Sequence, residues 1–513
     1  MSRTARIARN VVTNWLGFVI SAAITLLLTP VVLDELGSAR YGVWVLTSSV
    51  VGYYGLLDLG FRAGLTQHLT RYLAVRRFDI AGEYLSSAVV TMGAFACFVA
   101  VLAVSGAWLA PHLFDIPVGL AGEAFWCILI IGLGSAAQFA LFPFAAIFPA
   151  AERFDIANYI GISTRLVAAA GVLITLKLGY GLIGVSAATL LANLLDYTLR
   201  WWLSRRIVPQ LEFSRQRIVF SRLRDIFSFG IWNFLISINA YAYQHAPTIV
   251  IAAMMKMPAV GQYALATGLM QQISSLLSPV GQVMYPAAAA LDAQADRDGL
   301  RHLYHDGTRL MMLIMVSVVA TTAWLAEDFY RLWVGEQYLS GNAYHSVALL
   351  LQVLLLSTFT SFTANIGMEI LKGCGRIREI AVALICGSCL SVLVSVLFIP
   401  HFGLLGIAMA VVIASTIIDL IVVPIMVQRI LGLSVLDWVR KACFRPMLVC
   451  AVSAMMLGVL HHYLEIETWW DFMLSGTIAV TLCGGAVLAI GVTSEERERF
   501  LVRPFRRWAL ARA

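Results

Sequence analysis

The feature that most constrains this chain is a succession of apolar runs, each long enough to cross a membrane, that continues almost from end to end. Hydrophobic residues make up 60% of the 513 positions and charged residues only 13%, and the mean hydropathy is +0.83. A helix of about 20 apolar residues spans the hydrocarbon core of a bilayer. Soluble domains do not have this composition. The sequence therefore predicts an all-α polytopic membrane protein.

The apolar runs predict about fourteen transmembrane helices. They cover residues 11–33, 41–60, 83–109, 119–148, 156–176, 180–203, 223–254, 258–290, 307–326, 344–371, 376–399, 402–428, 441–462 and 470–492. The first run is too long for the apolar part of a signal peptide, so we interpret it as an uncleaved membrane span.

The distribution of Lys and Arg predicts how these helices are oriented. Of the 36 cationic residues, 31 fall on the side of the N-terminus, and Arg165 alone lies within a span. The four on the opposite side are Arg40, Lys177, Lys256 and Arg331. Cytoplasmic loops carry an excess of Lys and Arg, so both termini are predicted to be cytoplasmic. The net charge of +7 thus reflects membrane orientation, and nucleic acid is not a predicted partner.

The two halves of the chain resemble each other. Gly181, Leu182 and Gly184 match Gly403, Leu404 and Gly406 at an offset of 222. At an offset of 219, Asn14, Leu16, Thr29 and Gly42 match Asn233, Leu235, Thr248 and Gly261. Such duplication is typical of transporters, and it predicts two six-helix parallel repeats. The predicted parts are a bundle at 1–203, a flexible, arginine-rich cytoplasmic linker at 204–222, a bundle at 223–430, and two extra transmembrane helices with a basic cytoplasmic tail at 431–513.

The opening hairpin, residues 13–69, carries a family resemblance. Its landmarks are Asn14, Pro30, the LGxxxYGVW turn at 36–44 and the DLG at 58–60. It resembles the polysaccharide (O-antigen type) flippases of the multidrug/oligosaccharidyl-lipid/polysaccharide exporter superfamily, and the likeness covers about residues 10–430. The resemblance implies a bacterial inner-membrane transporter that moves a polyprenyl-diphosphate-linked oligosaccharide from the cytoplasmic to the outer leaflet. It also implies that the transporter acts together with a polysaccharide polymerase and a chain-length regulator in surface polysaccharide synthesis.

The sequence shows no hydrolytic triad, no ATP-binding loop and no metal motif. We therefore predict that the chain is not an enzyme and needs no cofactor or metal. The nearest metal-like pattern, His302, His305 and Asp306, is interpreted as part of a solvated cytoplasmic loop.

Polar residues recur inside several predicted spans. Those in 223–254 share one helical face, and others lie in 11–33 and 258–290; the candidates are Asn233, Ser237, Tyr241, Gln244, Asn14, Gln271 and Gln282. Hydroxyl and amide groups at membrane depth suit hydrogen bonds to sugars. The same groups can instead hydrogen-bond one helix to another, so both interpretations stay open.

Arg165 lies about 13 Å into its span, and Asp196 on the next span lies at a similar depth. One hypothesis is an ion pair between them that fixes the two helices. The other is that Arg165 attracts the diphosphate of the substrate, whose oxygens a guanidinium matches with two hydrogen bonds.

The candidates for ion coupling or gating are Asp419, Asp196, Asp58 and Glu369, and Arg62 is a further candidate for substrate binding. Asp58 and Arg62 are four residues apart, and either form a surface pair or contact a lipid headgroup. Asp419 is the repeat counterpart of Asp196, one residue out of register, and has no obvious partner of opposite charge; it is a candidate for proton or cation coupling or a hydrogen-bonded structural aspartate. Glu369, near the end of its span, is interpreted like the Asp58–Arg62 pair, either as an ordinary charge close to the membrane interface or as a gate or headgroup contact.

Three alternatives to the oligosaccharide flippase stay open. A flippase for a peptidoglycan precursor of the lipid II type differs only in the sugar. An ion-coupled drug/cation antiporter of the same superfamily usually ends after twelve spans. A non-transporting membrane scaffold is disfavoured by the duplication and the buried charges.

Overall fold

The computed structural model describes residues 3–58, 60–211, 213–282, 284–339 and 344–492. Every helical or extended element within these ranges is a helix. Ten segments of the described residues are long and apolar enough to cross a membrane. The chain is thus an all-α multi-pass membrane protein. The count of fourteen spans and the six-helix repeats stay predictions.

The contacts divide the chain into two compact units, residues 1–264 and 265–513. The predicted second bundle begins earlier, at residue 223, because that boundary came from sequence repeats and not from contacts. Helix α8 (Ser221–Met254) packs on α1 and α2 within the first unit. Helix α9 (Met257–Gln282) begins in the first unit and ends in the second.

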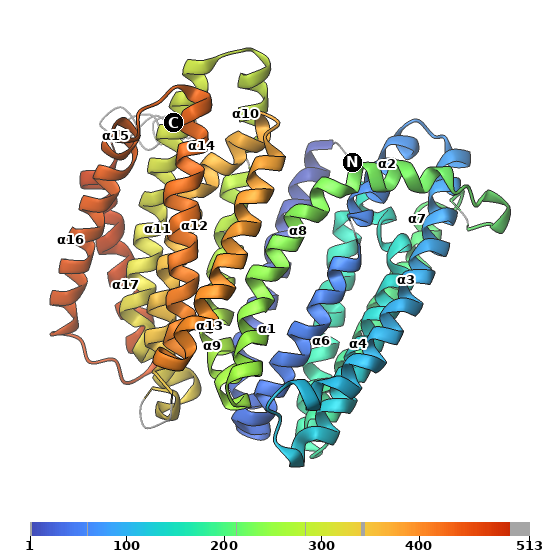
Figure 1. Ribbon diagram of the computed structural model, residues 1–513, viewed down its shortest axis with the longest axis horizontal. Helices are drawn as coiled ribbons and strands as arrows, with labels where there is room; N and C mark the ends of the chain where they lie inside the picture. Colours follow the sequence, from blue (N-terminus) through green and yellow to red (C-terminus); the bar gives the residue numbers. More distant parts are fainter. Residues whose placement is uncertain (1–2, 59, 212, 283, 340–343, 493–513) are drawn as a thin grey trace, which may run out of the picture. The chain divides into compact units, whose positions relative to one another are not determined.

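The first unit consists of long helices joined by short turns. They are α1 (Arg3–Gly52), α2 (Phe61–Ala74), α3 (Phe78–Leu113), α4 (Ala121–Ala145), α5 (Ile147–Ala150), α6 (Phe154–Lys177), α7 (Gly181–Ile207) and α8, with short 3-10 turns at Tyr53–Asp58, Val118–Leu120 and Arg215–Arg217. Helix α4 packs between α3 and α7, and α6 packs between α7 and α1 (Figure 1). The short α2 presents Phe61, Leu65 and Leu69 every four residues, so one apolar face enters the core beside Tyr84 and Leu85 of α3.

The second unit also consists mainly of long helices joined by short turns. Its helices are α10 (Met284–Ala293), α11 (Arg297–Val334), α12 (Val347–Gly373), α13 (Ile377–Ser415), α14 (Val423–Leu431), α15 (Val435–Trp438), α16 (Phe444–His461) and α17 (Trp469–Ala486), with a 3-10 turn at Glu336–Tyr338 and π-helical turns at Thr416–Val422, Val439–Cys443 and Val487–Gly491. Helix α11 packs against α12, α16 and α17 (Figure 1). The α11 helix includes His302, His305 and Asp306, so the solvated loop predicted for these residues is wrong.

Two helices are broken at glycines where the sequence predicted separate spans. The backbone of α1 turns at Gly37 (φ 74°), and that of α13 turns at Gly403 (φ 56°). Gly181, which the repeat pattern matches to Gly403, has a φ of 53° and begins α7. Glycine adopts positive φ without the steric cost of a Cβ atom. The two matched glycines therefore have the same backbone role.

A second matched pair of glycines lies in direct contact. Gly42 in α1 lies against the backbone carbonyl of Met257, and Gly261 in α9 faces the carbonyl oxygen of Ser38 and the amide nitrogen of Gly42. Both residues belong to the first unit. The absence of side chains allows the backbones of α1 and α9 to approach this closely.

The arginine-rich segment after α7 is attached to α3. The Ser87 hydroxyl donates to the carbonyl oxygen of Val219 (3.1 Å) and accepts from its amide (2.9 Å), and the Ser86 hydroxyl accepts from the amide of Ser214 (3.1 Å). Arg222 forms an ion pair of 2.9 Å with Glu83. Two serines on α3 thus supply partners that the composition of the segment does not reveal, and its flexibility stays a prediction.

Candidate functional site

Asp196 is paired with Arg200, one turn further along α7, and not with Arg165. Arg200 donates from Nε to Oδ2 (2.6 Å) and from Nη2 to Oδ1 (3.1 Å), and a second bond from Nη2 reaches the carbonyl oxygen of Ala157 in α6 (3.2 Å). The Thr164 hydroxyl also donates to Asp196 (3.2 Å). The predicted Arg165–Asp196 ion pair is thus wrong. The i,i+4 spacing of Asp196 and Arg200 was a visible signal for the observed pair.

Arg165 lies in α6 with its side chain exposed at the surface of the first unit. No residue in the described part of the chain forms an ion pair with it. A guanidinium at membrane depth without a protein partner is costly when it faces lipid. The geometry therefore leaves Arg165 available to an anionic ligand.

Arg62 and Asp58 lie where α2 begins. The Arg62 amide donates to Oδ1 of Asp58 (3.1 Å), and the Arg62 Nε lies 3.6 Å from Oδ2. The guanidinium lies over the ring of Phe142 in α4, 4.4 Å from its centroid. Arg62 and Asp196 line one cavity within the first unit, although they are far apart in the sequence.

The polar stripe predicted along α8 is described only in part. The side chains of Asn233, Ser237, Asn14 and Gln282 lie outside the described residues. Tyr241 packs against Gly55, and its ring stacks on His245 at 6.0 Å, so this part of the stripe fills a helix interface in the first unit. Gln244 in the first unit and Gln271 in the second are exposed.

Asp419 lies in the second unit, in the π-helical turn between α13 and α14. Its side chain is 4% exposed, and Oδ2 accepts a hydrogen bond from the Ser361 hydroxyl of α12 (2.7 Å). Beside it, Thr360 donates to Ser415 (3.1 Å). Within the ranges described, no cation forms an ion pair with Asp419. The sequence did not identify Ser361 as its partner, because that residue lies 58 positions away.

Glu369 is a buried residue near the end of α12. It accepts a hydrogen bond of 2.8 Å from Nζ of Lys372, one turn further along the same helix. The Lys372 ammonium group balances the charge of the buried Glu369 carboxylate, so no ligand is needed to explain its burial. The described residues contain no group of three or more His, Cys, Asp or Glu that could hold a metal ion.

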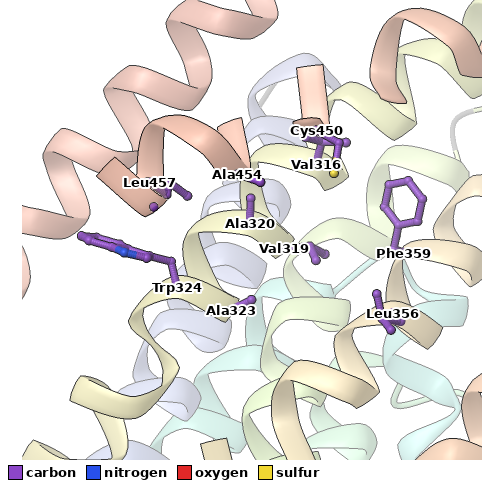
Figure 2. Close-up of a pocket in the computed structure, with 11 residues that line it drawn as sticks. Val316, Val319, Ala320, Ala323, Trp324, Leu356, Phe359, Cys450, Ala454 and Leu457 are labelled. Atoms are coloured by element: carbon purple, nitrogen blue, oxygen red, sulfur yellow. The ribbon is translucent and has the colours of Figure 1, made fainter. Parts of the chain in front are cut away.

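An apolar cavity of about 470 Å³ lies between α11, α12 and α16 in the second unit (Figure 2). The indole of Trp324 and the ring of Phe359 stand on opposite sides of it in this view. Its lining residues are Val316, Val319, Ala320, Ala323, Trp324, Leu356, Phe359, Cys450, Ala454, Leu457 and Gly458. The sequence did not reveal this cavity, because apolar residues at helical spacing look the same in a packed core and beside a pocket.

The family model described as "Polysaccharide biosynthesis protein" matches residues 36–342, which is more than half of the chain. The uncharacterised membrane protein EpsK of Bacillus subtilis is 21% identical over 503 residues, covering 96% of this chain and 97% of that protein. A putative O-antigen transporter of Shigella flexneri is 22% identical over 420 residues, covering 79% of this chain and 94% of that protein.

Among solved structures, an inward closed conformation of the lipid II flippase MurJ matches with a TM-score of 0.65. The match covers 93% of this chain and 98% of that one at 12% identity, so it supports the fold. The chain belongs to the family whose model is described as "Polysaccharide biosynthesis protein".

Proposed function

We propose that this protein moves a polyprenyl-diphosphate-linked oligosaccharide from the cytoplasmic to the outer leaflet of the bacterial inner membrane, by alternating access. The substrate would serve surface polysaccharide synthesis. Membrane lipid surrounds the transporter, and a polysaccharide polymerase and a chain-length regulator would act on the product. The family match and the similarity to a putative O-antigen transporter support the proposal.

The observation that carries the proposal is the apolar cavity of α11, α12 and α16. Its size is within the range of about 300–1,000 Å³ that is common for ligand pockets. A substrate with a polyprenyl tail needs an apolar surface for that tail, whereas a free sugar does not. Helix α16 follows the predicted repeats, so the cavity gives one of the two extra helices a role.

The headgroup has different needs. A diphosphate and several sugars require cations and hydrogen-bonding groups in a water-filled region. Arg165 offers an exposed guanidinium, and Gln244 and Gln271 offer exposed amides. Asn14, Asn233, Ser237 and Gln282 are further candidates for sugar contacts, whereas Tyr241 packs in a helix interface.

The test is transport by purified protein in proteoliposomes, with a fluorescent polyprenyl-diphosphate oligosaccharide whose exposure is measured by an impermeant quencher. Arg165→Ala should lower the transport rate about tenfold or more, since a charge-assisted hydrogen bond contributes about 1.5–3 kcal/mol. Lys177→Ala, at the far end of the same helix, is the matched control and should transport normally.

Three results would contradict the proposal in different ways. Transport of lipid II in preference to other oligosaccharide lipids would identify a peptidoglycan-precursor flippase. Proton-driven efflux of cationic drugs without lipid transport would identify an antiporter. Normal transport by a well-folded Arg165→Ala protein would remove Arg165 from the substrate site.

We propose that Asp419 couples transport to an ion gradient. Asp419→Asn should lose most gradient-driven transport while exchange at equal ion concentrations continues. Asparagine has the same shape and still accepts the hydrogen bond from Ser361, so the fold should be retained. The measurement is the transport rate with and without a pH or sodium gradient. An unchanged gradient dependence would disprove the coupling role, and loss of both modes with a lower melting temperature would assign Asp419 a structural role.

A further inference from the structure

A second cavity, of about 390 Å³, lies entirely within the first unit. Helices α2, α4, α6 and α7 contribute to it, close to the connections at which the arginines of this unit gather. The side chains that line it with polar groups are Arg62, Gln138, Asp196, Tyr197 and Arg200. Leu141, Phe142, Pro149 and Phe154 are among its apolar walls.

The acidic residue of this cavity is already neutralised. Asp196 receives two hydrogen bonds from Arg200 and one from Thr164. A carboxylate with these partners does not attract a cation, because its charge is balanced and both of its oxygens accept hydrogen bonds. The cavity is therefore not a cation site.

The donors of the cavity are largely unused. The Nε atom of Arg62 lies 3.6 Å from the nearest oxygen of Asp58, which is too long for a hydrogen bond. In the described part of the chain, no group accepts a hydrogen bond from the Arg62 guanidinium, the Tyr197 hydroxyl or the Gln138 amide. These three side chains come from α2, α7 and α4, and all are partly shielded from solvent.

Shielded donors without partners, gathered at one cavity, indicate a ligand that accepts several hydrogen bonds. The guanidinium carbon of Arg62 lies 4.4 Å from the centroid of the Phe142 ring, and a guanidinium carries five N–H donors in a planar fork. Such a fork matches the oxygens of a phosphate group. The apolar walls favour a phosphate that is attached to a hydrocarbon chain.

We infer that this cavity binds the phosphate group of a membrane lipid, with Arg62 as the charged ligand and Tyr197 and Gln138 as neutral donors. Two lipids carry this chemistry: an anionic phospholipid, and the polyprenyl diphosphate of the proposed substrate. Only the second identification rests on the proposed function. The site differs from the apolar cavity of α11, α12 and α16, which lies in the other unit.

The experiment is native mass spectrometry of the purified full-length protein, titrated with undecaprenyl diphosphate, phosphatidylglycerol or undecaprenol. Arg62→Gln should weaken binding of the phosphate-bearing lipids about tenfold, because it removes the charge-assisted bonds. Tyr197→Phe removes one donor without changing the packing, and should weaken binding by a smaller factor. Arg77→Gln removes an exposed cation that pairs with Asp79 and does not line the cavity, so its affinities should equal those of the wild type.

Comparison of the three lipids shows which kind of lipid supplies the phosphate group. Preference for undecaprenyl diphosphate would identify a substrate subsite, and equal binding of phosphatidylglycerol would identify a phospholipid site. Equal binding of undecaprenol, which has no phosphate, would overturn the inference. So would wild-type affinity in both Arg62→Gln and Tyr197→Phe, or the same loss in Arg77→Gln. Because binding is measured without transport, this result and the outcome of the transport assay are independent.

Discussion

Replacing Gly42 by alanine is expected to destabilise the first unit by about 3 kcal/mol, at the upper end of the usual cost of overpacking. The new Cβ would collide with the backbone carbonyl of Met257, and a backbone atom cannot rotate away as a side chain can. The helices α1 and α9 would have to separate. The measurement is the melting temperature of the purified protein in detergent, followed by intrinsic fluorescence, together with the yield of folded protein.

Gly93→Ala is the matched control. Gly93 lies inside α3, and nothing in its surroundings lies within 4 Å of the position that a Cβ would take. Alanine in a helix is favoured over glycine by about 0.5–1 kcal/mol, so this variant should melt at or slightly above the wild-type temperature. Equal melting temperatures for Gly42→Ala and Gly93→Ala would disprove the close contact between α1 and α9.

Filling the apolar cavity of the second unit should impair transport of a polyprenyl-linked substrate. Ala454→Phe places a ring in the space between α11, α12 and α16, at an exposed position of α16 where the core is not disturbed. Displacing two or three methylene groups of the tail costs about 2 kcal/mol, or about a thirtyfold loss of affinity. The measurement is the rate of transport as a function of substrate concentration, with a substrate of full tail length and one with a short tail.

Met455→Phe is the corresponding control. Met455 is adjacent on α16, is exposed, and does not line the cavity. It should transport at the wild-type rate. An Ala454→Phe protein that transports both substrates normally would show that the tail binds elsewhere, and a loss confined to the full-length tail would locate the tail in this cavity.

The sequence predicted the helical membrane fold because the length and apolar composition of each run can be read from consecutive residues, without knowledge of tertiary contacts. It also anticipated the hairpin at Gly181 and its match at Gly403, since positive φ selects glycine at both. It could not predict the anchoring of the segment after α7, where the partners are Ser86 and Ser87 on a distant helix. Nothing in a serine inside an apolar run states which backbone group it will meet.

In the candidate site, too, some features follow from the sequence of one helix and others depend on packing between helices. Counting residues predicts a similar membrane depth for Arg165 and Asp196, but depth does not specify the direction of a side chain, and Asp196 pairs with Arg200 on its own helix. The cavity that joins Arg62, Gln138 and Tyr197 requires three helices to converge. Convergence depends on packing between elements far apart in the chain, which periodicity within one element does not contain.

The π-helical turn at Thr416–Val422 has a further consequence for the second unit. Pro424, just after it, lacks an amide hydrogen and its ring would clash with the carbonyl group of Leu420 in a regular α-helix. The wider turn accommodates one surplus residue, so the helical faces before and after it are offset by about 100°. That offset lets Asp419 point toward Ser361 while Val423 and Val427 remain buried in the core. A single-residue insertion in an ancestral helix would create this arrangement, in which a polar group enters the interior without displacing the apolar residues that follow.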